Sequence, residues 1–204
     1  MKIVLSTLFS IISWLTVLIQ YNLMIENRLA SIFETTIRFF SFFTILTNLL
    51  VAIYFTLSFF KKNNRLRSII HRAGTLTAVT VYISIVGVVY QVVLRPIWEP
   101  KGIQMIVDEL LHSIIPILVI IYWYLYEDKI SVTFRQIPKW LIYPLVYLGY
   151  ILIRGAFSDF YPYPFVDVAS IGIEKVLTNS AVLMVLFMGV SAVYIKIGKV
   201  ISNK

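Results

Sequence analysis

The chain has no cysteine, and this absence removes several kinds of chemistry at once. Without thiols the protein forms no disulfide, no Cys-ligated metal site and no thiol-based catalytic centre. Charged residues are also scarce, at 14% of 204 residues, and there are only 2 histidines. Hydrophobic residues make up 59% of the chain, and the mean hydropathy is +0.86. This composition excludes an ordinary soluble domain.

Six long apolar runs account for the hydrophobic content. They cover about 3–21, 38–60, 74–94, 107–126, 140–157 and 174–195. Each is close to the roughly 20 residues that a helix needs to cross a bilayer core. We therefore predict an all-α polytopic membrane protein, a six-transmembrane-helix bundle forming a single domain over residues 1–204. The first run is interpreted as a span rather than a signal peptide, because no small-residue cleavage site follows it.

The basic residues predict the orientation of this bundle. Of the 18 Lys and Arg residues, 12 fall at the N-terminus, after the second and fourth runs, and at the C-terminus: Lys2, Lys61, Lys62, Arg65, Arg67, Arg72, Lys129, Arg135, Lys139, Lys196, Lys199 and Lys204. Only Glu127 and Asp128 of the 10 acids share those segments. Positive segments stay in the cytoplasm. We therefore expect a protein of the cell membrane with both termini on the cytoplasmic side. The net charge of +8 is thus juxtamembrane and indicates anionic lipids rather than nucleic acid as a partner.

Polar residues within the second span are candidates for function, because such groups are costly in hydrocarbon. Arg38, Ser41, Thr44 and Asn48 are spaced three, three and four residues apart. In a continuous helix this spacing puts them on one stripe, with Thr47 at its border.

The fourth span contains His112, the only histidine in any predicted span. Asp108 lies four residues before it and Glu109 three residues before it, so either carboxylate is placed to orient the imidazole. One span histidine without cysteine offers too few ligands for a metal site, and we expect no metal and no cofactor.

Helical rise links these two spans. Counted from Arg38, Thr44 lies about 9 Å into the membrane, and His112 lies about 6 Å below Asp108. Both residues are therefore expected at a similar depth in the outer half of the bundle. Other spans bring further polar residues to the same layer, namely Gln91, Arg95 and Arg154.

The longest outer connection, SDFYPYPFVDVASIG, follows the fifth span. Its Pro162 and Pro164 alternate with aromatic residues, which predicts a stiff, non-helical cap. Such a cap serves either as an interfacial aromatic belt or as a lid over a pocket.

A hydroxyl, an imidazole and a carboxylate are the ingredients of nucleophilic acyl transfer. Spacing alone leaves plainer alternatives open. A threonine in a span often bonds its own i−4 carbonyl, and Asn, Ser or His often joins neighbouring helices.

Three segments carry a family resemblance, namely FFTILTNLL, the span with HSIIP, and the YPYPF connection. The chain resembles the bacterial six-span relatives of the androgen-induced protein family over nearly its whole length. Animal members hydrolyse fatty acid esters of hydroxy fatty acids with an intramembrane threonine and histidine. The resemblance implies Thr44 and His112 in these roles, with Thr47 as the alternative nucleophile. One departure is Tyr122 before Trp123, where bacterial relatives often carry an aspartate.

We therefore predict an intramembrane hydrolase of a lipid-like ester. Thr44 attacks, His112 acts as base and then acid, and Asp108 or Glu109 orients the ring. Asn48, Ser41 and Gln91 are candidate oxyanion donors, and Arg38, Arg95 and Arg154 are candidate partners for a substrate carboxylate. The alternative is a non-enzymatic small transporter or lipid-binding protein that uses the same pocket. The oligomeric state is not defined by the sequence.

Overall fold

The computed structural model describes residues 1–58 and 72–202, and every regular element in these ranges is helical. In chain order the elements are α1 (Lys2–Glu26), α2 (Ile32–Phe39), α3 (Phe43–Leu57), α5 (Thr75–Val89), η1 (Tyr90–Leu94), η2 (Arg95–Ile97), α6 (Ile103–Glu109), η3 (Leu110–Ile114), α7 (Ile115–Tyr126), η4 (Phe134–Gln136), α8 (Ile137–Trp140), α9 (Ile142–Ser158), η5 (Pro164–Val166), α10 (Val168–Ile171) and α11 (Ile173–Ser202). Residues 59–60 of the second predicted span, and the basic segment up to His71, lie outside the described residues.

Among the residues that the structure describes, five continuous helical stretches are long and apolar enough to cross a membrane. They are Lys2–Glu26, Thr75–Ile97, Ile103–Tyr126, Phe134–Ser158 and Ile173–Ser202. The bent pair α2 and α3 makes a sixth if it is taken as one span. The length and composition of these helices are those of a multi-pass membrane protein.

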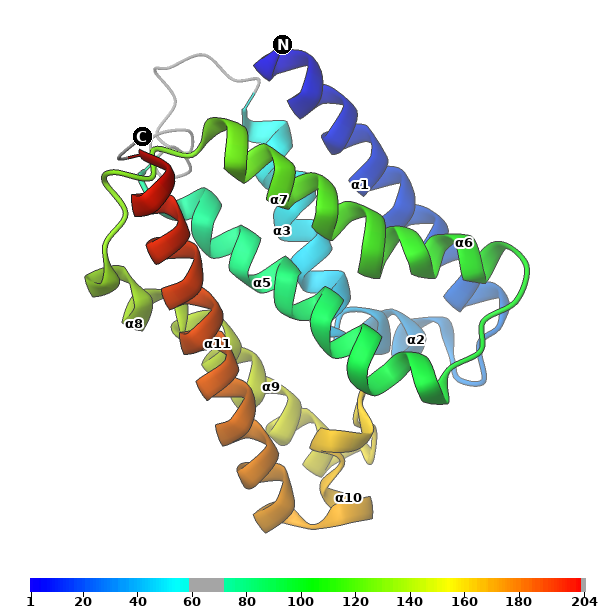
Figure 1. Ribbon diagram of the computed structural model, residues 1–204. Coiled ribbons are helices and arrows are strands. Elements are labelled where there is room, and N and C mark those ends of the chain that lie inside the picture. The colour runs from blue at the N-terminus through cyan, green and yellow to red at the C-terminus, as the bar shows by residue number, and fades with distance from the viewer. Residues whose placement is uncertain (59–71, 203–204) are drawn as a thin grey trace.

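The bundle is organised around α5, which packs against α3, α7 and α11 (Figure 1). In the span that contains α5, 67% of the most apolar 18-residue stretch is buried inside the protein. The corresponding share for α11 is 22%. Val81 and Ile83 of α5 are fully buried. α5 is therefore the central helix, and most of the surface of α11 is left for lipid.

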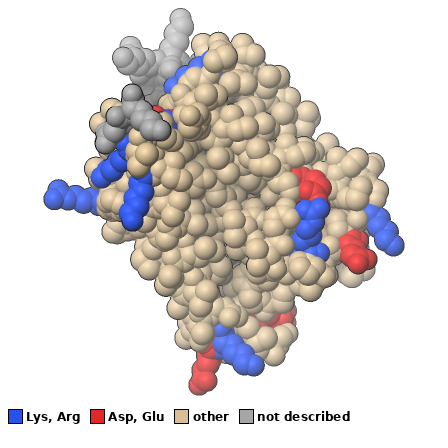
Figure 2. Space-filling model, viewed as in Figure 1, with Lys and Arg blue, Asp and Glu red and all other residues tan. Residues whose placement is uncertain are grey.

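Both termini lie at the same end of the molecule (Figure 1). On the face drawn in Figure 2, this end carries Lys and Arg side chains with little acid beside them, whereas the opposite end shows acids and bases together. The uneven distribution of charge along the bundle agrees with the clusters read from the sequence.

The second predicted span is not one helix. The axis bends by 71° between α2 and α3, and residues 40–42 form a turn. Ser41 Oγ donates to Ile37 O at 2.7 Å, and Tyr147 donates to Ser41 O at 2.8 Å. These hydroxyls satisfy backbone groups that the break leaves free, which makes it tolerable inside the protein.

This break corrects the prediction of a single polar stripe. Arg38 lies on α2, Ser41 lies in the turn, and only Thr44 and Asn48 share α3. The depth of Thr44 counted along a straight helix from Arg38 is therefore wrong.

Two other spans each contain one π-helical turn. η1 is followed by Pro96 and η3 by Pro116, and neither proline has a backbone N–H for the usual i−4 carbonyl. The N–H groups of Arg95 and Ile115 instead bond the carbonyls of Tyr90 and Leu110, five residues back. The π-turns re-pair the backbone within the span, and such turns are frequent at functional sites.

The outer cap contains more helix than the sequence predicted. Residues 164–166 form the 3₁₀ turn η5, and α10 follows at once. Pro164 stands in the first turn of η5, where a missing N–H costs nothing. The prediction of a cap without any helix is therefore wrong, although the segment does lie over one end of the bundle, away from the two termini (Figure 1).

Glu127, just after α7, connects the end of α7 to the start of α5. Its carboxylate accepts hydrogen bonds from the N–H groups of Gly74 at 3.2 Å and Thr77 at 2.9 Å, at the start of α5. Burial raises the pKa of the Glu127 carboxyl above its ordinary 4.5, and the N–H donors of Gly74 and Thr77 oppose the rise.

This raised pKa predicts a pH dependence of stability. The folded protein holds the Glu127 proton more tightly than the unfolded chain does, so the stability contributed by this group is complete below pH 4.5 and falls as the pH rises through the raised pKa. We expect Glu127→Gln to gain stability relative to the native protein as the pH rises from 4.5 through the raised pKa. Thermal unfolding in detergent measures this, with Glu99→Gln, at an exposed glutamate, as the control. A difference that does not change with pH would contradict the prediction.

Candidate functional site

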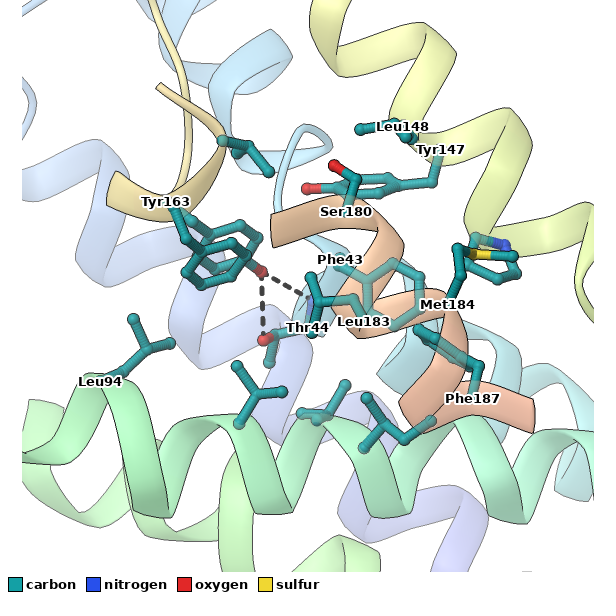
Figure 3. A pocket seen from close by; sticks show the side chains of 16 residues that line it. Phe43, Thr44, Leu94, Tyr147, Leu148, Tyr163, Ser180, Leu183, Met184 and Phe187 are labelled. Carbon is teal, nitrogen blue, oxygen red and sulfur yellow. Dashed lines mark hydrogen bonds between the residues drawn. The ribbon is translucent and has the colours of Figure 1, made fainter. Parts of the chain in front are cut away.

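An apolar cavity of about 80 Å³ lies among α3, α5, α9, η5 and α11. Apart from the hydroxyls of Thr44, Tyr147, Tyr163 and Ser180, its walls are hydrocarbon and aromatic side chains (Figure 3). The cavity is small compared with the pockets that hold drug-sized ligands, so a lipid chain requires its walls to move apart.

Thr44 lies in the wall of this cavity, at the start of α3. The first intrahelical bond of α3 runs from Leu46 N to Phe42 O, and no side chain of Phe42 caps the helix. The N–H groups of Phe43, Thr44 and Ile45 therefore have no partner within the helix. The break before α3 thus puts a helix N-terminus, with its positive dipole end, beside the Thr44 hydroxyl.

Tyr163, from the outer cap, meets Thr44 at this helix end. Its hydroxyl oxygen accepts from Thr44 N at 3.2 Å and lies 3.4 Å from Thr44 Oγ1 (Figure 3). The Tyr163 ring stacks on Phe165 at 5.2 Å with 4° between the planes, and it meets the edge of Phe42 at 5.8 Å. Packing on Phe165 and Phe42 therefore holds Tyr163 next to Thr44, the candidate nucleophile.

His112 lies on the π-turn η3 and is almost fully buried, at 9% exposure. Its Nδ1 is 2.8 Å from Asp108 O and 3.5 Å from Asp108 Oδ1. A carbonyl oxygen only accepts, so the neutral ring carries its hydrogen on Nδ1 and its lone pair on Nε2. Tyr90 stacks on the imidazole at 4.0 Å with 11° between the planes, which fixes the ring from its face.

Asn48 joins the turn that carries Thr44 to the turn that carries His112. Its Nδ2 donates to Thr44 O at 2.9 Å and to Leu111 O at 3.4 Å. No hydrogen bond connects Thr44 directly to His112 within the described residues, and His112 is not part of the cavity wall. Asn48 Oδ1 and Asp108 Oδ2 are buried acceptors that receive no hydrogen bond from the described part of the chain.

The other hydroxyls of the predicted site lie elsewhere. Thr47 is fully buried, and its Oγ1 bonds Tyr143 at 3.1 Å outside the cavity wall. The Ser41 hydroxyl donates to Ile37 O at the break between α2 and α3. Of Thr44 and Thr47, the structure places only Thr44 at the cavity.

Glu109 and Gln91 form a separate, more exposed network. Glu109 accepts from Arg95 and from Ser113 Oγ, the latter at 2.6 Å, and Gln91 Nε2 donates to Ser113 Oγ at 2.9 Å. Asp108 rather than Glu109 is therefore the carboxylate beside His112. Neither Gln91 nor Arg95 is brought to Thr44.

Arg38 and Arg154 share Glu34 near the cap segment. They bond Glu34 Oε1 at 2.8 Å and 2.7 Å, and both guanidinium groups lie over the ring of Phe160. This cluster links α2 to α9 and to the cap. Both arginines already have a carboxylate partner within the protein, so a substrate carboxylate would compete with Glu34.

Two features next to Thr44 were missed in the sequence analysis. One is Tyr163, interpreted there only as part of an aromatic cap. The other is the backbone N–H of Thr44 itself, which lies outside the hydrogen bonds of α3 and donates to the Tyr163 hydroxyl. The YPYPF motif indicated an ordered cap, but no sequence pattern indicated which of its aromatic residues would reach α3.

Comparisons with protein-family models, with curated proteins and with solved structures found no match to this chain. The resemblance read from the three short motifs therefore remains an expectation, and the chemistry of the site rests on its own residues.

Proposed function

We propose that the protein is an intramembrane hydrolase of a lipid-like ester, with Thr44 as its nucleophile and His112 as its base. The observation that carries this proposal is the position of Thr44. Its hydroxyl lies in the wall of an apolar cavity, at a helix N-terminus where the Thr44 N–H has no partner within the helix and donates to the Tyr163 hydroxyl. The resemblance to fatty acid ester hydrolases supports the same roles.

In the proposed reaction, Thr44 Oγ1 attacks the ester carbonyl carbon while its proton passes to His112 Nε2. The carbonyl oxygen becomes an oxyanion, stabilised by the Thr44 N–H and the Tyr163 hydroxyl as donors. His112 returns the proton to the leaving alcohol oxygen, which leaves an acyl ester on Thr44. Water, deprotonated by His112, then attacks the carbonyl carbon of that ester. The bond from this carbon to Thr44 Oγ1 breaks, His112 returns the proton to Thr44 Oγ1, and the acid is released.

Asp108 and Tyr90 serve this reaction by holding the imidazole. The Asp108 carbonyl fixes the hydrogen on Nδ1, and its carboxylate at 3.5 Å stabilises the imidazolium that forms. The proposal requires the Thr44 hydroxyl and His112 to come within direct or one-water reach when substrate binds. A tightening of this kind between the free and substrate-bound states is common in enzymes.

We propose that the chain crosses the cell membrane six times, with α2 and α3 together as one broken span. Both termini would then face the cytoplasm, because the basic clusters lie at their end of the bundle. The cavity beside Thr44 would be reached from the outer half of the membrane, and membrane lipids or lipid-like esters would be its ligands.

Labelling with a fluorophosphonate probe tests the proposal directly. We expect the purified protein to form a covalent adduct at Thr44, identified by peptide mass spectrometry, because a hydroxyl near a base and oxyanion donors reacts with such probes. His112→Ala is expected to abolish the adduct. Labelling that survives His112→Ala, or that falls on Thr47, would contradict the assigned roles.

The second candidate function is a non-enzymatic small transporter or lipid-binding protein. It is favoured by the almost wholly apolar cavity wall and by the Thr44 hydroxyl having Tyr163, rather than His112, as its neighbour. Passage of a lipid-like molecule across liposomes that contain the protein, with no turnover of any ester, would support this function over the hydrolase.

A further inference from the structure

A second hollow, of about 430 Å³, lies beside the Thr44 cavity at the outer end of α11. Lys175, Thr178 and Asn179 contribute its polar wall. Thr178 and Asn179 follow Lys175 by three and four residues, so both lie one turn from it on the same side of α11. Val93, Pro164 and Ile171 are among the apolar residues that complete the hollow.

Phe165 lines both hollows, so the two are neighbours. Its carbonyl accepts from Asn179 Nδ2 at 3.0 Å, and its ring stacks on Tyr163, the residue that contacts Thr44. The two hollows also follow one another along α11, because Ser180 and Phe187 line the inner one. From Lys175 to Phe187 the helix rises by about 18 Å. One elongated ligand therefore spans both hollows if the Phe165 ring turns aside.

Lys175 differs from the three arginines that the sequence suggested as anion partners. Arg38 and Arg154 are paired with Glu34, and Arg95 is paired with Glu109. The structure gives Lys175 no ion pair or hydrogen bond to any residue it describes. Asn179 adds a second donor at this hollow, since its amide has two N–H bonds and Phe165 O takes one.

We propose that Lys175, with Asn179, binds the anionic end of the substrate whose ester lies at Thr44. The substrate is then an amphiphile with an acidic group, a carboxylate or a phosphate, at the outer hollow and a hydrocarbon chain that passes Phe165. This assignment rests on the hydrolase proposed above. It makes Lys175 a specificity residue for charged over neutral esters.

The test compares two long-chain esters that differ only in a free terminal carboxylate or its methyl ester. We expect Lys175→Gln to raise KM for the charged ester about fivefold to tenfold, with kcat unchanged and no effect on the neutral ester. Lys101→Gln, an exposed outer lysine that lines neither hollow, is the matched control. Equal effects of Lys175→Gln on both esters, or no effect on either, would overturn the assignment.

A third ester that ends in a phosphate identifies the source of the anion. A larger loss for the phosphate ester than for the carboxylate ester in Lys175→Gln assigns the hollow to a phosphate group, and the reverse assigns it to a carboxylate.

Binding separates a failure of this assignment from a failure of the hydrolase. Displacement of a fluorescent fatty acid by an unlabelled long-chain acid is measured in the native protein and in Lys175→Gln. If the unlabelled acid displaces the fluorescent acid from the native protein but not from Lys175→Gln, and no ester is turned over, the anion site is supported and the hydrolase is contradicted. Ester turnover with the same KM in the native protein and in Lys175→Gln would support the hydrolase and contradict the anion site.

Discussion

Thr44→Ala is expected to lower kcat for a long-chain ester by about three orders of magnitude or more, because it removes the nucleophile. His112→Ala is expected to lower kcat by about 10² to 10⁴, the usual contribution of a positioned base. Tyr163→Phe keeps the stacked ring and loses one oxyanion donor, so we expect a loss of about 10² to 10³. Hydrolysis by the purified variants, followed by release of the free acid, measures all three.

Two matched variants make this result specific. Thr47→Ala removes a fully buried hydroxyl that lies one turn along α3 but outside the cavity wall, and it is expected to leave kcat nearly unchanged. Thr44→Ser keeps a hydroxyl at the same place and is expected to retain activity. Equal activity of the native protein, Thr44→Ala and His112→Ala, at equal thermal stability, would show that Thr44 and His112 are not catalytic.

Gly155→Ala is expected to disturb the outer cap and the site beneath it. A Cβ on Gly155 would lie 2.0 Å from Cε1 of the Tyr161 ring, so the ring and the cap segment that carries it must move. Overpacking of this kind costs about 1–3 kcal/mol. Because Tyr163 is two residues further along the same cap, its contact with Thr44 should be lost as well.

Gly149→Ala provides the control on the same helix, since nothing lies within 4 Å of the Cβ it would add. There the substitution is expected to leave the unfolding temperature unchanged or to raise it slightly, because alanine favours helix by up to about 1 kcal/mol over glycine. Thermal unfolding in detergent compares the two. Equal unfolding temperatures for both variants would mean that Tyr161 does not pack on α9 as described.

The candidate site was predicted in part from the sequence. The choice of His112, with either Asp108 or Glu109 beside it, followed from local spacing, since residues three or four apart on a helix are neighbours whatever surrounds them. The stripe from Arg38 to Asn48 failed because it assumed one straight helix. Hydrogen bonds of Ser41 and Tyr147 stabilise the break, and Tyr147 comes from a different span more than 100 residues away.

The long apolar helices follow from the sequence alone, because the hydrocarbon thickness and the rise per residue fix the length of an apolar run. The clusters of positive charge are likewise visible without any structure. Only the tertiary structure decided which threonine faces the cavity, which carboxylate lies beside His112, and that Tyr163 reaches the start of α3. The position of Thr44 and its contact with Tyr163 depend on residues distant in the chain, through the packing of α3, α9, α11 and the cap. The choice between the carboxylates depends on Arg95 of another span, which pairs with Glu109.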